Sequence, residues 1–220
     1  MIIAIDGPSG AGKSTLAKRL AKDLGFTYLD TGAMYRALAL KVLRTGTDLA
    51  DERAVEALVR DTDISVYEDD GTLRVLLDGI DVSGAIRTPE VSQMASKASA
   101  LRPVRARMLE LQREAGRKRN VVAEGRDIGT VVFPQAEVKI FLDASVEERA
   151  RRRFEELRGA GREVSLEQTL REIEERDRRD SERALAPLSK APDALTIDNS
   201  LLSANQVAEQ ALEEIRKRWM

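Results

Sequence analysis

The feature that most constrains this 220-residue chain is a glycine-rich octapeptide at residues 7–14, Gly-Pro-Ser-Gly-Ala-Gly-Lys-Ser. A short apolar run, Met1–Ile5, precedes it, and a stretch of helical character, Ser14–Leu24, follows it. Strand, glycine loop and helix in direct succession are the opening unit of an α/β fold. The octapeptide fits G-x-x-x-x-G-K-[ST] in the strand-to-helix context that this pattern requires.

A loop of this kind binds the phosphates of a nucleoside triphosphate. Its glycines let backbone N–H groups turn inward around the phosphate oxygens, and the helix N-terminus adds partial positive charge. Lys13 is expected to reach the β- and γ-phosphates, and the Ser14 hydroxyl to ligate Mg²⁺. The predicted site for ATP and Mg²⁺ comprises Gly7, Pro8, Ser9, Gly10, Ala11, Gly12, Lys13, Ser14 and Thr15. The alternative, a glycine-rich turn without a ligand, is disfavoured by the strand-to-helix context.

Composition limits the chemistry further. The chain has no Cys and no His, which excludes disulfides, thiolate and imidazole metal sites, and histidine catalysis. Any metal must therefore be a hard, oxygen-ligated ion such as Mg²⁺. The net charge of −2 argues against a nucleic-acid or anionic-membrane binder. No apolar stretch is long enough to span a membrane and no signal peptide is recognisable, so we expect a cytoplasmic protein. We also expect the protein to be a monomer.

Further apolar runs at residues 120–123, 138–142 and 194–197 have strand length and alternate with helical stretches. Residues 26–29 are a weaker candidate. Buried parallel strands have this character, so the expected fold is α/β, a P-loop NTPase-like parallel sheet flanked by helices. One such domain is expected to span residues 1–220.

The stretch from Ile64 to Val82 departs from this alternation of strands and helices. Its apolar residues alternate, and Asp70-Gly71 and Asp78-Gly79 separate the alternating runs. Aspartate-glycine pairs between alternating runs are typical of hairpin turns. We predict a small three-stranded antiparallel lobe, inserted at about residues 62–86.

Arginine is concentrated between residues 149 and 183, where eleven occur. Ser145 and Ser165 each begin a capping-box pattern, so two helices are expected, separated by Gly159 and Gly161. We predict a helical lid over residues 149–183 whose arginines neutralise a phosphoryl group in transfer. The alternative is exposed helix faces on which interleaved glutamates pair with arginines at i,i+4. Most of the eleven are expected to be such surface charges, and three or four to be functional.

Proteins with a phosphate loop include switches, motors and small-molecule kinases, and the fold does not choose among them. A GTPase switch would carry the base-binding sequence N-K-x-D, which is absent. Residues 81–84 match the D-x-x-G of switch proteins, but they lie in the expected insert and not after a buried strand. The absence of histidine favours an acceptor that is itself a phosphate dianion, since such a nucleophile needs an arginine clamp and no general base. A kinase is therefore favoured over a nucleotide-dependent switch or binding module, and over a kinase for sugar or shikimate hydroxyls.

Several segments resemble the signatures of the bacterial cytidylate kinases. They are residues 30–36 (DTGAMYR), 81–88 (DVSGAIRT), 124–134 (EGRDIGTVVFP), 139–144 (KIFLDA) and 175–183 (ERDRRDSER). The likeness extends from the phosphate loop to about residue 198, and the run at 124–134 is its most distinctive part. It implies ATP-dependent phosphorylation of CMP, and of dCMP as well, within a nucleoside-monophosphate kinase fold. The nearest alternative keeps this class and changes the acceptor to UMP, AMP or dTMP.

The resemblance also implies roles for individual residues. Arg36, Arg126 and Arg183 would hold the acceptor phosphate, and with Lys13 they form the expected catalytic set. Cytosine would be bound by Ser96, Arg105 and Asp127, and the ribose by Arg176 and Asp180. The expected substrate-binding set is Thr31, Tyr35, Arg36, Ser96, Arg105, Arg126, Asp127, Arg176, Asp180 and Arg183.

Three of these positions have their own physical arguments. Thr31 stands where many relatives have Ser, and either residue keeps a hydroxyl. Asp127 can accept a hydrogen bond from the cytosine N4 amino group, whereas uracil presents a carbonyl there, a mismatch worth about 1–3 kcal/mol. Tyr35 is either an aromatic at the core edge or a stacking partner of the base.

Glu124 is the candidate for a second metal ligand. It ends an apolar strand, where it would either hold Mg²⁺ or its waters or remain a solvated strand-end acid.

Overall fold

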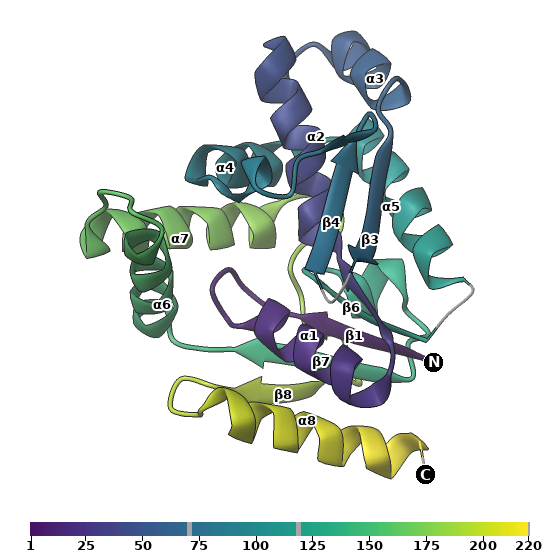
Figure 1. Ribbon diagram of the computed structural model, residues 1–220, viewed down its shortest axis with the longest axis vertical. Helices are drawn as coiled ribbons and strands as arrows, with labels where there is room; N and C mark the ends of the chain where they lie inside the picture. The colour runs from purple at the N-terminus through teal and green to yellow at the C-terminus, as the bar shows by residue number, and fades with distance from the viewer. Residues whose placement is uncertain (70–71, 118–119, 220) are drawn as a thin grey trace. The chain divides into compact units, whose positions relative to one another are not determined.

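The computed structural model describes residues 1–69, 72–117 and 120–219 (Figure 1). The chain forms two compact units: Met1–Phe26 with Asn120–Met220, and Thr27–Arg119. Five strands make a parallel sheet in the order β2-β6-β1-β7-β8, and three more make an antiparallel sheet in the order β3-β4-β5. The α/β class expected from the sequence is therefore confirmed.

The first unit alternates strands and helices. Its strands are β1 (Ile2–Asp6), β6 (Val121–Gly125), β7 (Val138–Asp143) and β8 (Leu195–Asp198), and its helices are α1 (Lys13–Leu24), α6 (Val146–Gly159), α7 (Leu166–Glu182) and α8 (Ala204–Trp219). Each predicted strand is present, within two residues at either end. β1 is central, pairing in parallel with both β6 and β7, and its residues Ile3, Ala4 and Ile5 are fully buried. Such complete burial explains why this strand is a continuous apolar run.

Helices α1 and α8 pack against each other and against the parallel sheet (Figure 1). α1 buries Leu16, Ala17, Leu20 and Ala21, which recur at one-turn spacing. It ends where Gly25 adopts a left-handed conformation (φ 67°) and its N–H bonds to carbonyls of the last turn. The helix therefore starts and stops at glycines and covers the sheet with one apolar stripe.

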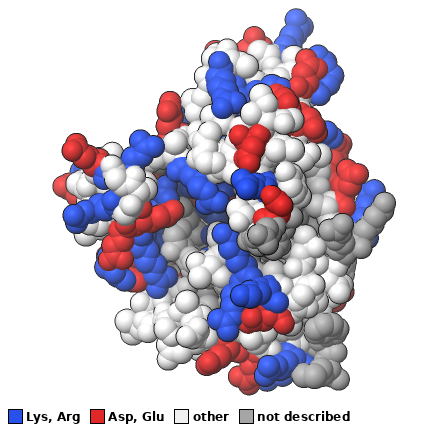
Figure 2. All heavy atoms as spheres, in the orientation of Figure 1, with Lys and Arg blue, Asp and Glu red and all other residues white. Residues whose placement is uncertain are grey.

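Helices α6 and α7 pack against each other as a hairpin. Ser145 accepts a hydrogen bond from the Glu148 N–H at 3.2 Å, and Ser165 accepts one from the Gln168 N–H at 3.1 Å. Both predicted helix starts are thus confirmed as N-caps. Acidic and basic side chains are interspersed over the surface of this hairpin (Figure 2).

The second unit comprises β2 to β5 and α2 to α5. Its strands are β2 (Thr27–Asp30), β3 (Ile64–Asp69), β4 (Thr72–Leu77) and β5 (Ile80–Asp81), and its helices are α2 (Thr31–Thr45), α3 (Glu52–Arg60), α4 (Pro89–Ala98) and α5 (Arg102–Gly116). The predicted three-stranded antiparallel sheet is confirmed, although its third strand has only two residues. Positive φ angles at Asp78 (51°) and Gly79 (80°) make the predicted turn before that strand. The other predicted turn, Asp70-Gly71, lies outside the described residues.

Prolines set the limits of two helices in this unit. Thr88 caps α4 by accepting from the Val91 N–H at 3.2 Å, with Pro89 in its first turn. Pro103 lies in the first turn of α5, so the chain breaks there into two helices. In the described part of the chain, every helix is too short or too polar to cross a bilayer.

Candidate active site

The phosphate loop joins β1 to α1, and two glycines make its shape possible. Gly7 lies so close to β7 that a Cβ atom would sit 2.0 Å from the Leu142 carbonyl oxygen. Gly12 adopts φ 87° at the N-cap of α1, a left-handed conformation that costs glycine little. No side chain caps this helix, so its first N–H groups are left for a ligand.

Lys13 is buried at the start of α1, and its Nζ donates a hydrogen bond to the Pro8 carbonyl at 2.6 Å. Burial of the ammonium group and the neighbouring Arg126 together lower the pKa of Lys13 to about 7, although Glu124 acts in the opposite direction. The pKa of Lys13 is low mainly because its buried ammonium group is poorly solvated. Triphosphate oxygens beside it would favour the charged form.

The expected second metal ligand is Glu124, buried on β6 directly opposite Ile5 of β1. It is close enough to Lys13 to influence its pKa, which places it at the same end of the sheet as the phosphate loop. Ser14 is exposed in the first turn of α1. Within the described ranges, no group of three acidic side chains could bind a metal ion by itself. One hydroxyl and one carboxylate fit Mg²⁺, which takes most of its ligands from phosphate and water.

Three of the predicted substrate-binding residues, Arg126, Arg176 and Asp180, lie together near Lys13. Arg126 donates from Nε to Asp180 at 2.9 Å, and the Nε atom of Arg176 lies 3.9 Å from the same carboxylate. Burial alone would raise the pKa of Asp180, but the two arginines outweigh it and hold that pKa below its usual value. Burial would likewise lower the pKa of Arg126, but Asp180 and other acids raise it. Both side chains are therefore charged.

Arg183 follows the last residue of α7 and has two partners. Its Nη2 donates to Asp127 at 3.3 Å, and its Nε donates to the Ala186 carbonyl at 2.7 Å. The Arg183 and Asp127 side chains are each only 6% exposed. A residue expected to hold phosphate is thus paired with one expected to bind the base.

Asp6, the last residue of β1, is a site residue that the sequence patterns did not reveal. Its two carboxylate oxygens accept the N–H groups of Ile128 and Gly129, each at 2.7 Å. These amides begin a π-helical turn, Ile128–Val132, directly after Asp127. Burial raises the pKa of Asp6 to about 6, although both N–H bonds oppose the rise. Asp6 thereby fixes the segment that carries Arg126 and Asp127.

The second unit contains the other predicted substrate-binding residues, mostly on α2. Asp30 caps this helix, accepting from the Ala33 N–H at 2.8 Å, and also accepts from Arg36 at 2.9 Å. The Arg105 guanidinium lies 5.9 Å from the centroid of the Tyr35 ring, a cation–π contact between α5 and α2. Tyr35 is therefore in contact with a predicted base-binding residue. Thr31 and Ser96 are buried, in the first turn of α2 and on α4.

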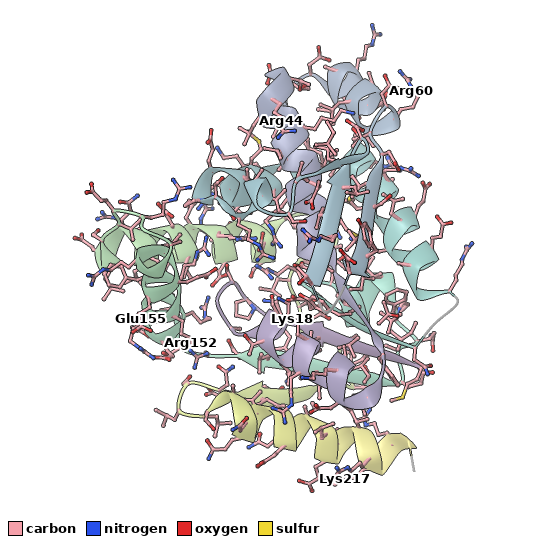
Figure 3. All side chains as sticks on the ribbon, viewed as in Figure 1. Lys18, Arg44, Arg60, Arg152, Glu155 and Lys217 are labelled. Carbon is pink, nitrogen blue, oxygen red and sulfur yellow. The ribbon has the colours of Figure 1, made fainter. Side chains whose placement is uncertain are left out.

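The remaining support for the phosphate loop comes from α6 and from the loop after β8. Asn199 donates from Nδ2 to the Ala11 carbonyl at 2.7 Å. Arg152, labelled in Figure 3, reaches from α6 to Asn199 and donates to its carbonyl at 2.8 Å. No motif identified Asn199, because its partner lies 188 residues earlier in the chain.

The glycine loop, the buried lysine and the neighbouring arginines define a P-loop kinase. Comparison with known proteins then gives the family, because the cytidylate kinase family profile matches residues 3–217. The chain is 52% identical to the cytidylate kinase of Syntrophotalea carbinolica over 218 residues, covering 99% of this chain and 93% of the relative. It is 54% identical to that of Caldanaerobacter subterraneus subsp. tengcongensis over 215 residues, covering 98% and 94%. The protein belongs to the cytidylate kinase family.

A crystal structure of an uncharacterized protein from Eubacterium ventriosum resembles the chain with a TM-score of 0.54 at 14% identity, covering 99% of both chains. At this identity the likeness concerns the fold alone. Family membership confirms the resemblance noted in the sequence and makes the protein a nucleoside-monophosphate kinase, with nucleotide substrates and ATP as donor.

Proposed function

We propose that the protein transfers the γ-phosphoryl group of ATP to the phosphate of CMP, and also of dCMP, in a direct in-line step. The observation that carries the proposal is the cluster around Asp180. Arg126 and Arg176 share this one carboxylate, and Lys13 beside them has a pKa lowered to about 7. Cations gathered at one place in this way can bind the phosphate groups of both donor and acceptor.

The acceptor phosphate needs no general base, because its oxygen is already an anionic nucleophile. The chain has no histidine to supply one. We assign Arg36, Arg126 and Arg183 to the acceptor phosphate and Lys13 to the β- and γ-phosphates. These cations would stabilise the charge that spreads over the transferred group, which is the main catalytic effect in phosphoryl transfer.

The carboxylate partners of these arginines suggest how CMP replaces them. Arg183 is paired with Asp127, and both are almost fully buried. The CMP phosphate would take over Arg183, while the cytosine N4 amino group would take over Asp127. Each group would then exchange one hydrogen-bond partner for another, so that no buried polar group is left without a partner. Uracil could not complete this exchange, because it presents an acceptor to the Asp127 carboxylate.

The other substrate contacts follow the assignments made from the family resemblance. We place Ser96 and Arg105 at the cytosine acceptors, and Arg176 and Asp180 at the ribose. Thr31 contributes a hydroxyl, and Tyr35, in contact with Arg105, stacks on the base.

Magnesium is the metal that this site fits. We assign the Ser14 hydroxyl as a direct ligand, and Glu124 as a ligand through water. When bound, the ion would neutralise charge on the β- and γ-phosphate oxygens. The chain's own residues position the phosphates through the loop amides and Lys13.

We further propose that residues 149–183 act as a lid over ATP and residues 62–86 as an insert that accompanies acceptor binding. We expect the protein to act as a cytoplasmic monomer that binds neither nucleic acid nor membranes. The net charge of −2 is consistent with this expectation.

An acceptor screen tests the proposed function. ADP release would be measured by a coupled assay with CMP, dCMP, UMP, AMP and dTMP, with Lys13→Met as the inactive control. CMP and dCMP should be preferred over UMP by roughly 5- to 150-fold in kcat/KM, as expected for one mismatched polar group. Equal rates with CMP and UMP would contradict cytosine recognition by Asp127.

A further inference from the structure

Arg149 and Asp177 come from different helices of the α6–α7 hairpin and meet at Ser9 of the phosphate loop. Arg149 forms a direct ion pair with Asp177 and donates from Nη1 to the Ser9 carbonyl at 3.0 Å. The other oxygen of Asp177 accepts the Ser9 N–H at 3.2 Å. The amide and the carbonyl of one loop residue are thus held by the two members of a single ion pair.

Arg149 is buried and hydrogen-bonded in this position, unlike an arginine that moves with a lid. Its side chain is 8% exposed, and its Nε donates to the Ala144 carbonyl at 2.9 Å. The backbone beside it touches the loop, because a Cβ atom on Gly10 would lie 3.0 Å from the Arg149 carbonyl oxygen. These contacts hold the Arg149 side chain in place and leave it little freedom to move toward a ligand.

We propose that Arg149 and Asp177 are positioning residues that clamp the phosphate loop in the conformation that binds ATP. The clamp fixes the peptide planes on both sides of Ser9. These planes set the direction of the amides that follow, between Gly10 and Lys13, which must converge on the triphosphate. Holding these amides ready removes an ordering cost from nucleotide binding.

The clamp also divides the hairpin into two parts. The first turns of α6 and the Asp177 turn of α7 are bonded to the loop, whereas the connecting tip around Gly161 (φ 74°) is not. Closure over ATP would therefore occur in the tip and not through the whole hairpin. This inference rests on ATP as the donor, as proposed above.

The first experiment measures MgATP binding by calorimetry without an acceptor. The variants are Arg149→Met, Asp177→Asn and the double variant, and the control is Arg151→Met, a neighbouring arginine that is 53% exposed. Each single variant should weaken MgATP binding at least about tenfold, because each leaves one buried charge without its partner. The double variant should be no weaker than the weaker single one, and the control should stay within twofold. CMP affinity should change by less than about threefold in every variant.

Single variants that bind MgATP within twofold of the native protein would overturn the proposal, and so would losses that simply add in the double variant. Equal losses of CMP and MgATP affinity would also overturn it, since they would indicate general damage to the fold. Failure of the proposed function would appear separately, as native protein that binds MgATP but does not phosphorylate CMP.

A milder substitution covers the case in which these variants fail to fold. Arg149→Lys keeps the charge but cannot donate to Ala144, Ser9 and Asp177 together. Hydrogen exchange of the amides of residues 9–13 should be faster in this variant than in the native protein, with exchange in β1 unchanged. Unchanged exchange in the loop would contradict the clamp.

Discussion

Arg151 and Arg178 are exposed on the α6–α7 hairpin, whereas Arg149 in α6 and Arg183 directly after α7 are buried; we call them the outer and the inner arginines. The outer side chains are 53% and 56% exposed, and the inner ones are 8% and 6% exposed. The outer pair bond to glutamates of their own helices. The inner pair bond to aspartates 28 and 56 residues away in the chain, and Arg149 also bonds to the Ser9 carbonyl, 140 residues earlier.

The difference shows that position, and not residue type, decides what an arginine does here. Water screens the exposed pairs, so their loss has little consequence. A buried arginine cannot lose its partner without leaving an uncompensated charge, and substrate phosphate can serve as such a partner. The following predictions test this division, beginning with Arg126, which like the inner pair is bonded to an aspartate from a distant part of the chain.

The largest effect is expected for Arg126→Met, which removes the cation between Asp180 and Lys13. The value of kcat/KM for CMP should fall by about 10³-fold or more, as for other cations that stabilise a phosphoryl transition state. Steady-state kinetics with both substrates measures it. A loss below tenfold would place Arg126 outside the catalytic set.

Asp127→Asn tests the partner of the inner Arg183. The preference for CMP over UMP should fall by roughly 5- to 150-fold, because the amide can serve either base edge. MgATP affinity should remain nearly unchanged. If MgATP affinity collapses instead, Asp127 belongs to the metal site and not to the base site.

The charge around Lys13 predicts a pH dependence of ATP binding. In the free enzyme the pKa of Lys13 is about 7, so the group is largely neutral at pH 8. Bound triphosphate favours the ammonium form and raises this pKa, so binding takes up a proton above pH 7 and affinity falls by at most about tenfold per pH unit. Calorimetry at pH 8 in buffers of different ionisation enthalpy should show this uptake. Binding without proton uptake would contradict a depressed pKa in the free enzyme.

The smallest effects are expected for the outer arginines. Arg151→Gln and Arg178→Gln should leave kcat/KM for CMP within twofold and the melting temperature within about 2 °C. Thermal unfolding and the kinetic assay measure both. A tenfold loss in either variant would remove the distinction between the two groups.

Much of the fold could be predicted from local patterns. The phosphate loop was identifiable because its glycines, Lys13 and Ser14 lie within eight consecutive residues. The parallel strands were recognisable as apolar runs, and the antiparallel sheet by alternation around Asp78-Gly79. Helix starts at Ser145 and Ser165 followed from caps that span three residues.

The supports of the candidate site could not be predicted, because they join distant positions. Asp177 lies 168 residues from Ser9, and Asp6 lies 122 residues from Ile128. Nothing in the local sequence distinguishes Arg149 from Arg151, since both occupy a charged helix. The roles proposed for Ser96, Arg105 and Asp127 came from family resemblance, and spacing alone would not have selected them.

The central claim is that the acceptor phosphate of CMP is the nucleophile, and the most direct test is to identify the atom that receives the γ-phosphoryl group of ATP. ATP labelled in its γ-phosphate would be incubated with the enzyme and either CMP or cytidine, and the products separated. The label should appear in the β-phosphate of CDP, with none on cytidine, because Arg36, Arg126 and Arg183 are proposed to hold an acceptor phosphate that is itself the nucleophile. Label on cytidine, or on a hydroxyl of CMP, would contradict the account.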